Sequence, residues 1–137
     1  MTTPRFWREI EQRYRGIGVQ CEICDRVYFP PREICPHCRR ESFGKMNERE
    51  LSGKGKVLTY TEVHDPHPDF KFLTPYIMAI IEMEEDVRVT GQLVGVDYKD
   101  VETGMEVKAT MRRLGEESPE GIIYYGYKFA PVKDKHE

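Results

Sequence analysis

Four cysteines close together constrain this chain more than any other feature of its 137 residues. Cys21 and Cys24 form one Cys-x-x-Cys pair, ten residues follow, and Cys35 and Cys38 form a second pair. Two residues between thiols allow one tight turn to aim both sulfur atoms at the same ion, so two such pairs are typical of a closed tetrahedral metal site. We therefore predict one structural ion held by the four thiolates, with zinc expected rather than iron.

Other uses of the four thiols fit the sequence less well. Disulfides are disfavoured because the N-terminal segment lacks the apolar centre of a signal peptide, which predicts a cytoplasmic protein. A redox dithiol would leave the second pair without a role. Iron in the same site would instead indicate an electron carrier. His37 lies inside the second pair and is expected to face solvent, because four thiolates already complete the shell.

The residues around the cysteines predict a zinc ribbon over 17–50, in which a hairpin lies between two metal-binding knuckles. Val27, Tyr28 and Phe29 favour a short strand. Pro30 and Pro31 then end the pairing. A further strand is expected after the second knuckle, leading out of the ribbon.

Residues 1–16 predict an N-terminal helix, with helical periodicity over 3–14. Phe6, Trp7, Ile10 and Tyr14 recur at spacings of three and four and form one apolar stripe. A helix of this length is marginal in water by itself and needs a surface to pack against. That surface is either the body of the same chain or a partner protein, and the sequence leaves both open.

Residues 51–137 read as strands, with no helix long enough to build a core. Each segment has strand-like composition or period-two alternation, and turn-rich residues separate them. Val57, Thr59, Thr61 and Val63 are expected on one face of the first strand. The five predicted strands are 55–64, 76–83, 87–94, 105–113 and 122–129. The fold class is therefore mainly β: an N-terminal helix, a rubredoxin-like zinc ribbon and a five-stranded OB-fold barrel, with a small sandwich as the alternative.

Charge and hydropathy exclude some functions. Residues 1–40 hold eight Lys and Arg against five Asp and Glu, a net charge of +3. Residues 41–137 hold thirteen against nineteen, a net charge of −6. A nucleic-acid-binding face needs an excess of cations, so the larger part of the chain is not expected to bind nucleic acid. No apolar run approaches the ~20 residues that span a bilayer, so no membrane partner is expected.

No motif in the chain carries a reaction. The cysteines are committed to metal, and no serine lies in a nucleophile elbow. The segment 64–69 holds two histidines and two aspartates, but its proline steps indicate a loop rather than a metal site. The apolar residues that follow, Phe70, Phe72 and Leu73, would be costly to expose unless they cover a groove or a partner. We therefore predict a protein without catalytic residues.

The order of motifs resembles one known family. The aromatic helix, the two cysteine pairs around Phe29-Pro30-Pro31-Arg32, Ser52-Gly53-x-Gly55-x-Val57, Pro75-Tyr76 and Gly91-x-Leu93-Val94 occur in the same order in it. The sequence is similar to the acyl-CoA-associated family built from a rubredoxin-like zinc ribbon and an OB-fold, domain of unknown function 35. The ribbon motif alone is not specific, but the ordered set covers nearly the whole chain.

This resemblance implies a non-catalytic, acyl-CoA-binding scaffold or accessory subunit of a thiolase-type enzyme. In archaea, a protein of this family bridges acetoacetyl-CoA thiolase and HMG-CoA synthase at the entry to the mevalonate pathway and helps to form a shared CoA site. Thiolase and HMG-CoA synthase are therefore the expected partners. The alternative is a nucleic-acid-binding module, because zinc ribbons and OB-folds also serve that role.

If the resemblance holds, coenzyme A or an acyl-CoA is an expected ligand. Its pantetheine arm suits a narrow apolar groove, and its phosphates need Arg or Lys. The junction of ribbon and barrel offers both kinds of residue. Packing between the two domains is the competing role of Tyr60 and Tyr76, and an ion pair with an acid is the competing role of Arg32. The expected CoA-binding residues are Phe29, Pro31, Arg32, Tyr60, Lys71 and Tyr76.

Overall fold

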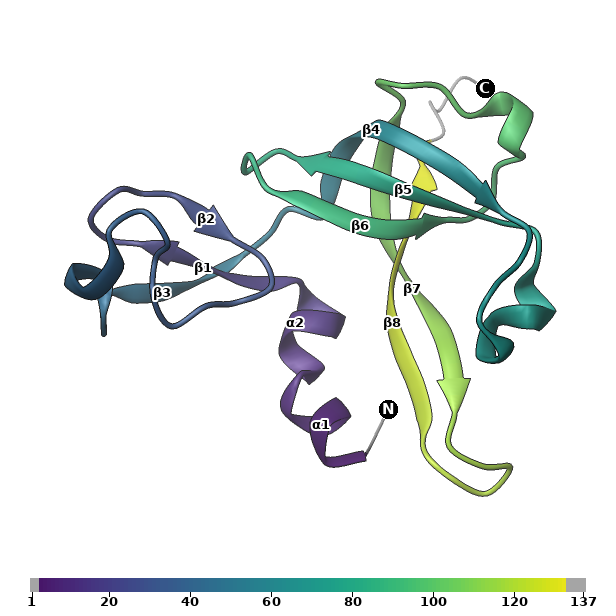
Figure 1. The fold of residues 1–137 in the computed structure, drawn as a ribbon, viewed down its shortest axis with the longest axis horizontal. Helices are drawn as coiled ribbons and strands as arrows, with labels where there is room; N and C mark the ends of the chain where they lie inside the picture. The colour runs from purple at the N-terminus through teal and green to yellow at the C-terminus, as the bar shows by residue number, and fades with distance from the viewer. Residues whose placement is uncertain (1–2, 133–137) are drawn as a thin grey trace.

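The computed structural model describes residues 3–132 and divides into short helices, a small three-stranded sheet and a closed barrel (Figure 1). The helices of the N-terminal part lie between the small sheet and the barrel. The small sheet has the order β2-β1-β3 and the barrel the order β4-β5-β6-β8-β7. The α-helices and the strands of the ribbon are α1 (Thr3–Arg8), α2 (Ile10–Arg15), β1 (Ile17–Cys21), β2 (Val27–Tyr28) and β3 (Met46–Glu50). The strands of the barrel are β4 (Lys54–Val63), β5 (Tyr76–Met83), β6 (Arg88–Leu93), β7 (Glu106–Glu116) and β8 (Ile123–Pro131).

The mainly β fold, with a zinc ribbon followed by a five-stranded barrel, is confirmed. All five predicted barrel strands are present within a few residues of their expected ends. The core of the barrel consists of the inward-facing residues of these strands, with Leu51 and Val101 from the connections. Its fully buried members are Val57, Ile81, Val107 and Phe129. Closure comes from β4 pairing with β7 on one side and from β6 meeting β8 on the other.

The predicted face of the first barrel strand is wrong beyond Val57. The register of β4 against β5 shifts between Val57 and Thr59, which marks a bulge. Val57 is buried, but Thr59 and Thr61 are exposed, while Tyr60 packs against the core instead. One extra residue in a strand turns every later side chain to the opposite face, so simple alternation fails there.

The predicted helix over 3–14 is interrupted at Glu9. The break allows the rings of Phe6 and Tyr14 to approach within 6.1 Å. Eight residues of straight helix would separate the two residues by about 12 Å along the axis. The Glu9 carboxylate accepts hydrogen bonds from Arg5 at 3.1 Å and from Arg13 at 2.6 Å, and these bonds hold its pKa below the ordinary value.

The apolar stripe of the helices divides between the protein body and solvent. Phe6 is buried, and its ring packs edge-on against Tyr124 of β8 at 4.7 Å. Trp7 is 71% exposed. The stripe therefore packs on the same chain through Phe6, while the indole of Trp7 remains available to a partner.

The predicted hairpin between the knuckles is also placed differently. β2 pairs with β1, which precedes the first knuckle, so the hairpin encloses that knuckle rather than lying between the two. The expected strand after the second knuckle is β3, and it pairs with the other edge of β1 over five positions, from Ile17 opposite Glu50 to Cys21 opposite Met46.

Three short 3-10 helices complete the described chain: η1 (Arg39–Ser42), η2 (Pro68–Leu73) and η3 (Tyr98–Asp100). η2 lies in the long connection from β4 to β5. The β7–β8 hairpin extends beyond the barrel and runs beside the helices (Figure 1). Among the described residues, no helix is long and apolar enough to cross a membrane.

Candidate functional site

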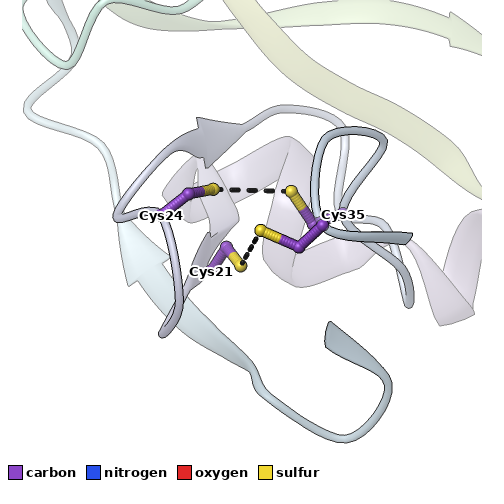
Figure 2. Close-up of side chains that lie close together, drawn as sticks. Cys21, Cys24 and Cys35 are labelled. Atoms are coloured by element: carbon purple, nitrogen blue, oxygen red, sulfur yellow. Dashed lines mark hydrogen bonds between the residues drawn. The ribbon is translucent and has the colours of Figure 1, made fainter. Parts of the chain in front are cut away.

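The four cysteine thiols converge in the ribbon (Figure 2). All four sulfur atoms lie within 4.8 Å of one another, with Cys24 Sγ to Cys35 Sγ at 3.6 Å and Cys21 Sγ to Cys38 Sγ at 4.0 Å. Four sulfur atoms at the Zn–S distance of about 2.3 Å around one zinc ion are separated by about 3.8 Å. The spacing therefore fits a tetrahedral zinc ion, and the donor set is the one that zinc prefers in structural sites.

Local structure aims the thiols inward. Cys21 is the last residue of β1, and Cys35 and Cys38 precede η1. Ser42 of η1 fixes the second knuckle, because its hydroxyl accepts the Cys35 backbone N–H at 2.8 Å and donates to the Arg39 carbonyl at 2.6 Å. Cys21 and Cys35 are buried and the other two cysteines half-buried. Four thiolates would complete a tetrahedral shell and leave no position for a substrate.

The electrostatics of the thiols favour a bound cation. Burial acts to raise the pKa of Cys35, but hydrogen bonds from the Tyr28 hydroxyl and from the backbone amides of Cys38 and His37 outweigh it and lower the pKa to about 6. Burial and the neighbouring thiols raise the pKa of Cys38 to about 12. Four thiolates at these distances repel one another, and a divalent cation between them removes that repulsion. Together with the ribbon architecture, this geometry supports one zinc ion.

The six expected CoA-binding residues do not converge on one site. Phe29 and Tyr76 line the same groove, whereas the other four lie outside it. Arg32 is exposed, with its guanidinium 5.8 Å from the centre of the Tyr28 ring, and Pro31 is exposed beside it. Lys71 is exposed on η2, and Tyr60 packs against Tyr98 at 5.5 Å on the barrel.

Packing between ribbon and barrel uses other residues than the two tyrosines. The ring of Phe29 lies 5.8 Å from that of Tyr127 on β8, which joins the ribbon loop to the barrel. The ring of Tyr76 faces Phe70 at 6.4 Å, within the connection that contains η2. Phe72 on the same short helix is 74% exposed, so the loop has the uncovered apolar residue that the sequence indicated.

The groove that holds Phe29 and Tyr76 has a volume of about 520 Å³, and we call it the seam groove. It lies between the N-terminal helices, the ribbon loop, η2 and the outer faces of β5, β6 and β8. Lys128 of β8 lines it and is only 6% exposed. Burial, and next the charge of Arg112, lower the pKa of Lys128. The lining residues used below are Arg5, Glu9, Arg13, Met78, Gln92 and Lys128.

Sequence reasoning missed the cations of this groove. Lys128 alternates with the inward-facing Tyr127 and Phe129 on a strand, which is the pattern of an ordinary solvent-facing lysine. Its burial comes from residues far away in the chain that pack over this part of the barrel, so no local pattern marks it. The sequence contained one indirect indication of these cations. Arg5 and Arg13 lie on a helix that was expected to need a packing surface.

The acid–base candidates of the loop 64–69 stay apart as two local pairs. His64 Nε2 lies 3.0 Å from Glu62, and His67 Nδ1 lies 3.4 Å from Asp69, all on or beside exposed loop backbone. Within residues 3–132, the four cysteines are the one group of three or more His, Cys, Asp or Glu whose ligand atoms gather closely enough to hold a metal.

Known proteins are similar to this chain over nearly its whole length. A model of the rubredoxin-like zinc ribbon domain of ChsH2 matches residues 8–44, and a model of the C-terminal OB-fold domain of ChsH2 matches residues 48–112. A DUF35 domain-containing scaffold protein of Methanocaldococcus jannaschii is 52% identical over 130 residues, which is 95% of this chain and 91% of that protein.

Two further relatives are named as components of enzymes, one of a thiolase and one of an aldolase. The benzoylsuccinyl-CoA thiolase subunit BbsA of Geobacter metallireducens is 30% identical over 116 residues, 84% of this chain and 73% of that protein. Among solved structures, a chain of the Ltp2-ChsH2(DUF35) aldolase superposes with a TM-score of 0.70 and 30% identity, covering 96% of both chains.

Proposed function

This chain belongs to the DUF35 family, in which a rubredoxin-like zinc ribbon precedes an OB-fold domain, and from this premise we propose that it is a non-catalytic scaffold of a thiolase-type enzyme. The observation that carries the proposal is the 52% identity to a scaffold protein over both the ribbon and the barrel. The relationship to thiolase subunits supports an acyl-CoA enzyme as the partner.

The scaffold role is tested by recovery from the source cells. A tagged chain is expected to retain a thiolase-type enzyme through gel filtration, with the partner identified by mass spectrometry. The purified chain alone is expected to convert no acyl-CoA thioester. Conversion of acetoacetyl-CoA by the chain, free of companion enzymes, would overturn the proposal.

A finer form of the proposal names the two partners. The chain bridges acetoacetyl-CoA thiolase and HMG-CoA synthase in the mevalonate pathway, in the cytoplasm, where reduced thiols persist for zinc binding. Mixing the chain with both purified enzymes is expected to give one ternary complex by native mass spectrometry. Omitting the chain should leave the two enzymes separate, and a thiolase complex that excludes HMG-CoA synthase would contradict the bridging role.

The acyl-CoA part of the proposal rests on the ribbon loop and η2. Phe29 and Pro31 offer apolar surface for pantetheine, and Arg32 and Lys71 are exposed cations that can reach phosphates. Tyr60 and Tyr76 complete the proposed set. Because these residues are spread over two elements and the barrel, the partner enzyme supplies the rest of the site.

Calorimetric titration with CoA distinguishes a site that is shared with the partner enzyme from a site that this chain forms alone. The complex with the thiolase is expected to bind CoA more tightly than the isolated chain. Arg32→Gln or Lys71→Gln should weaken CoA binding to the complex. Lys108→Gln, which changes an exposed lysine on β7 outside the proposed CoA surface, should not. Equal affinity in all three variants would remove these cations from the proposed CoA surface.

Nucleic acid remains a less supported ligand. OB-folds bind single strands on the outer face of the strands that correspond to β5 and β6. Here the ribbon loop and the N-terminal helices wall that face, and residues 41–137 carry a net charge of −6. A salt-titrated assay with single-stranded DNA and RNA is expected to show no sub-micromolar binding.

A further inference from the structure

The barrel has a seam where β6 and β8 separate. These strands meet at one register position, Leu93 opposite Phe129, with the Val94 N–H donating to the Phe129 carbonyl at 2.8 Å. β6 pairs with β5 along its other edge, and β8 pairs with β7 along its other edge. From the meeting point the two strands diverge, because β8 continues into the projecting hairpin (Figure 1). Thr90 to Gln92 and Gly126 to Lys128 therefore face each other across an opening.

The seam groove occupies this opening. Its lining includes both diverging segments, 90–92 and 126–128. On the barrel side the opening is closed by the Phe129 ring, which lies so close to Gly91 that a Cβ atom there would be 2.5 Å from the ring. Within the described chain, neither segment has a ladder partner on the edge that faces the groove. Exposed strand edges of this kind accept an added strand through backbone hydrogen bonds.

The groove is cationic in a chain of net charge −3. Arg5, Arg13 and Lys128 line it, against the single carboxylate of Glu9. Glu9 already accepts hydrogen bonds from both arginines. Among the described residues, the ammonium of Lys128 has neither a hydrogen-bond acceptor nor an ion-pair partner; the residue is only 6% exposed, but its Nζ still reaches solvent. An unpaired ammonium at the wall of the groove can form a charge-assisted hydrogen bond with an anion supplied from outside.

The shape of the site favours an extended chain over an isolated anion. Apolar side chains of Phe29, Tyr76 and Met78 flank Lys128 in the groove. A second groove of about 790 Å³ shares Arg13, Phe70 and Leu114 with it and continues along the projecting hairpin. Two open strand edges, apolar walls and one unpaired cation together match a strand that carries an acidic side chain.

We propose that an extended segment of the thiolase-type partner docks in the seam groove, pairs with the open edge of β6 or β8, and places an Asp or Glu carboxylate on Lys128. This inference rests on the proposed function, since it names how the partner is held. The ammonium of Lys128 is the specific anchor, and Arg5 and Arg13 add general attraction for the acidic segment. The CoA surface on the ribbon loop and η2 lies outside the groove, except for Phe29 and Tyr76 at its wall.

Carbodiimide coupling tests the contact directly, because it joins an amine to a carboxylate only when they touch. In the purified complex, mass spectrometry is expected to find Lys128 joined to an Asp or Glu of the partner. Amides of residues 90–92 or 126–128 should also gain protection from hydrogen exchange on complex formation. Lys128→Met, which keeps most of the side-chain length and removes the charge, should abolish the cross-link and weaken the complex at least tenfold, whereas Lys108→Gln should leave the affinity unchanged.

The outcomes separate this inference from the scaffold role. A complex of full affinity with Lys128→Met, or one without new protection at either edge, overturns the docking groove and leaves the scaffold role standing. Absence of any complex overturns both. Protection of the same amides by CoA alone, lost in Lys128→Met while the complex is retained, would show a small-molecule site in place of a docking groove.

Discussion

Gly91 shows how one residue can determine whether the barrel closes. A Cβ atom at this position would lie 2.5 and 2.6 Å from two ring carbons of Phe129, the fully buried aromatic residue of the core. The ring cannot move away without disturbing the single register position that joins β6 to β8. Position 91 requires glycine, because the Phe129 ring occupies the space that a Cβ atom would need.

Gly91→Ala should lower the free energy of unfolding by about 1–3 kcal/mol, the usual penalty for overpacking a core. Urea titration followed by circular dichroism measures it. Gly115→Ala is the matched control, because a Cβ atom at Gly115 would meet nothing within 4 Å. Equal stability of the Gly91→Ala variant and the wild-type protein would show that the seam adapts, contrary to the close packing described here.

Lys128 is a second residue that affects stability, because its surroundings disfavour the charged form of its side chain. Its pKa is lowered, chiefly by burial and then by the charge of Arg112. Arg13, Arg5 and Glu9 also face the groove. A lysine whose pKa is lowered in the folded state opposes folding while it is charged, and this opposition fades as the pH rises through the lowered pKa toward the ordinary value of 10.5.

Lys128→Met should therefore raise the stability of the free chain at pH 7, by no more than about 1 kcal/mol, since a lysine whose charged form is disfavoured by its surroundings is replaced by an apolar side chain. The gain over wild-type should shrink as the pH approaches 10.5. Urea midpoints of both proteins at pH 7 and 10 give the comparison. A loss of stability at pH 7 would mean that the ammonium stabilises the fold itself and is not kept for binding an incoming anion.

At the scale of elements, the N-terminal helices combine internal packing with an exposed face. Phe6 is 4% exposed between Tyr14 and Tyr124, whereas its neighbour Trp7 is 71% exposed. Two large aromatic residues side by side in the sequence thus have opposite environments. One holds the helices on β8, and the other is offered to solvent.

Phe6→Ala should detach the helices and lower the free energy of unfolding by about 3 kcal/mol, as for other buried aromatic truncations. Trp7→Ala should change it by no more than about 0.5 kcal/mol, as for other exposed positions. The thiolase complex should weaken in both variants, because Phe6→Ala displaces the helices from the barrel and Trp7→Ala removes the exposed indole that is proposed to contact the partner. Retention of the thiolase with full affinity by Trp7→Ala would leave the indole without a role in binding.

The elements also show what the sequence could predict. Strand positions were predicted well because alternation is local, and the metal site because the cysteine spacing itself encodes the geometry. The bulge after Val57 and the break at Glu9 were not predicted from the sequence, since each depends on what the element packs against. The seam groove was not predicted at all. Its lining comes from six separate stretches of the chain, and Lys128 becomes a candidate only after distant residues cover it.

At the scale of the whole molecule, the ribbon and the barrel are stabilised by different means. The barrel has a continuous core of buried apolar residues, from Leu51 to Phe129. The ribbon fully buries few apolar residues besides Ile17, Val19, Cys21 and Cys35, and three others, Ile23, Ile34 and Phe43, are exposed. A segment of this kind depends on its metal for folding free energy.

Zinc removal should therefore unfold residues 17–50 and leave 51–132 folded, apart from loosening at the contact of Phe29 with Tyr127. Hydrogen exchange followed by mass spectrometry, before and after addition of a chelator, is expected to show loss of protection in β1 to β3 and its retention in β4 to β8. Cys38→Ser should give the same pattern without a chelator, while His37→Ala, which changes an exposed neighbour, should keep the zinc. Because the ribbon loop also walls the seam groove, the chelated chain should lose the thiolase even though its barrel persists. Simultaneous loss of protection in both parts would mean that they fold as one unit. The boundary between residues 50 and 51 would then separate two architectures but not two folding units.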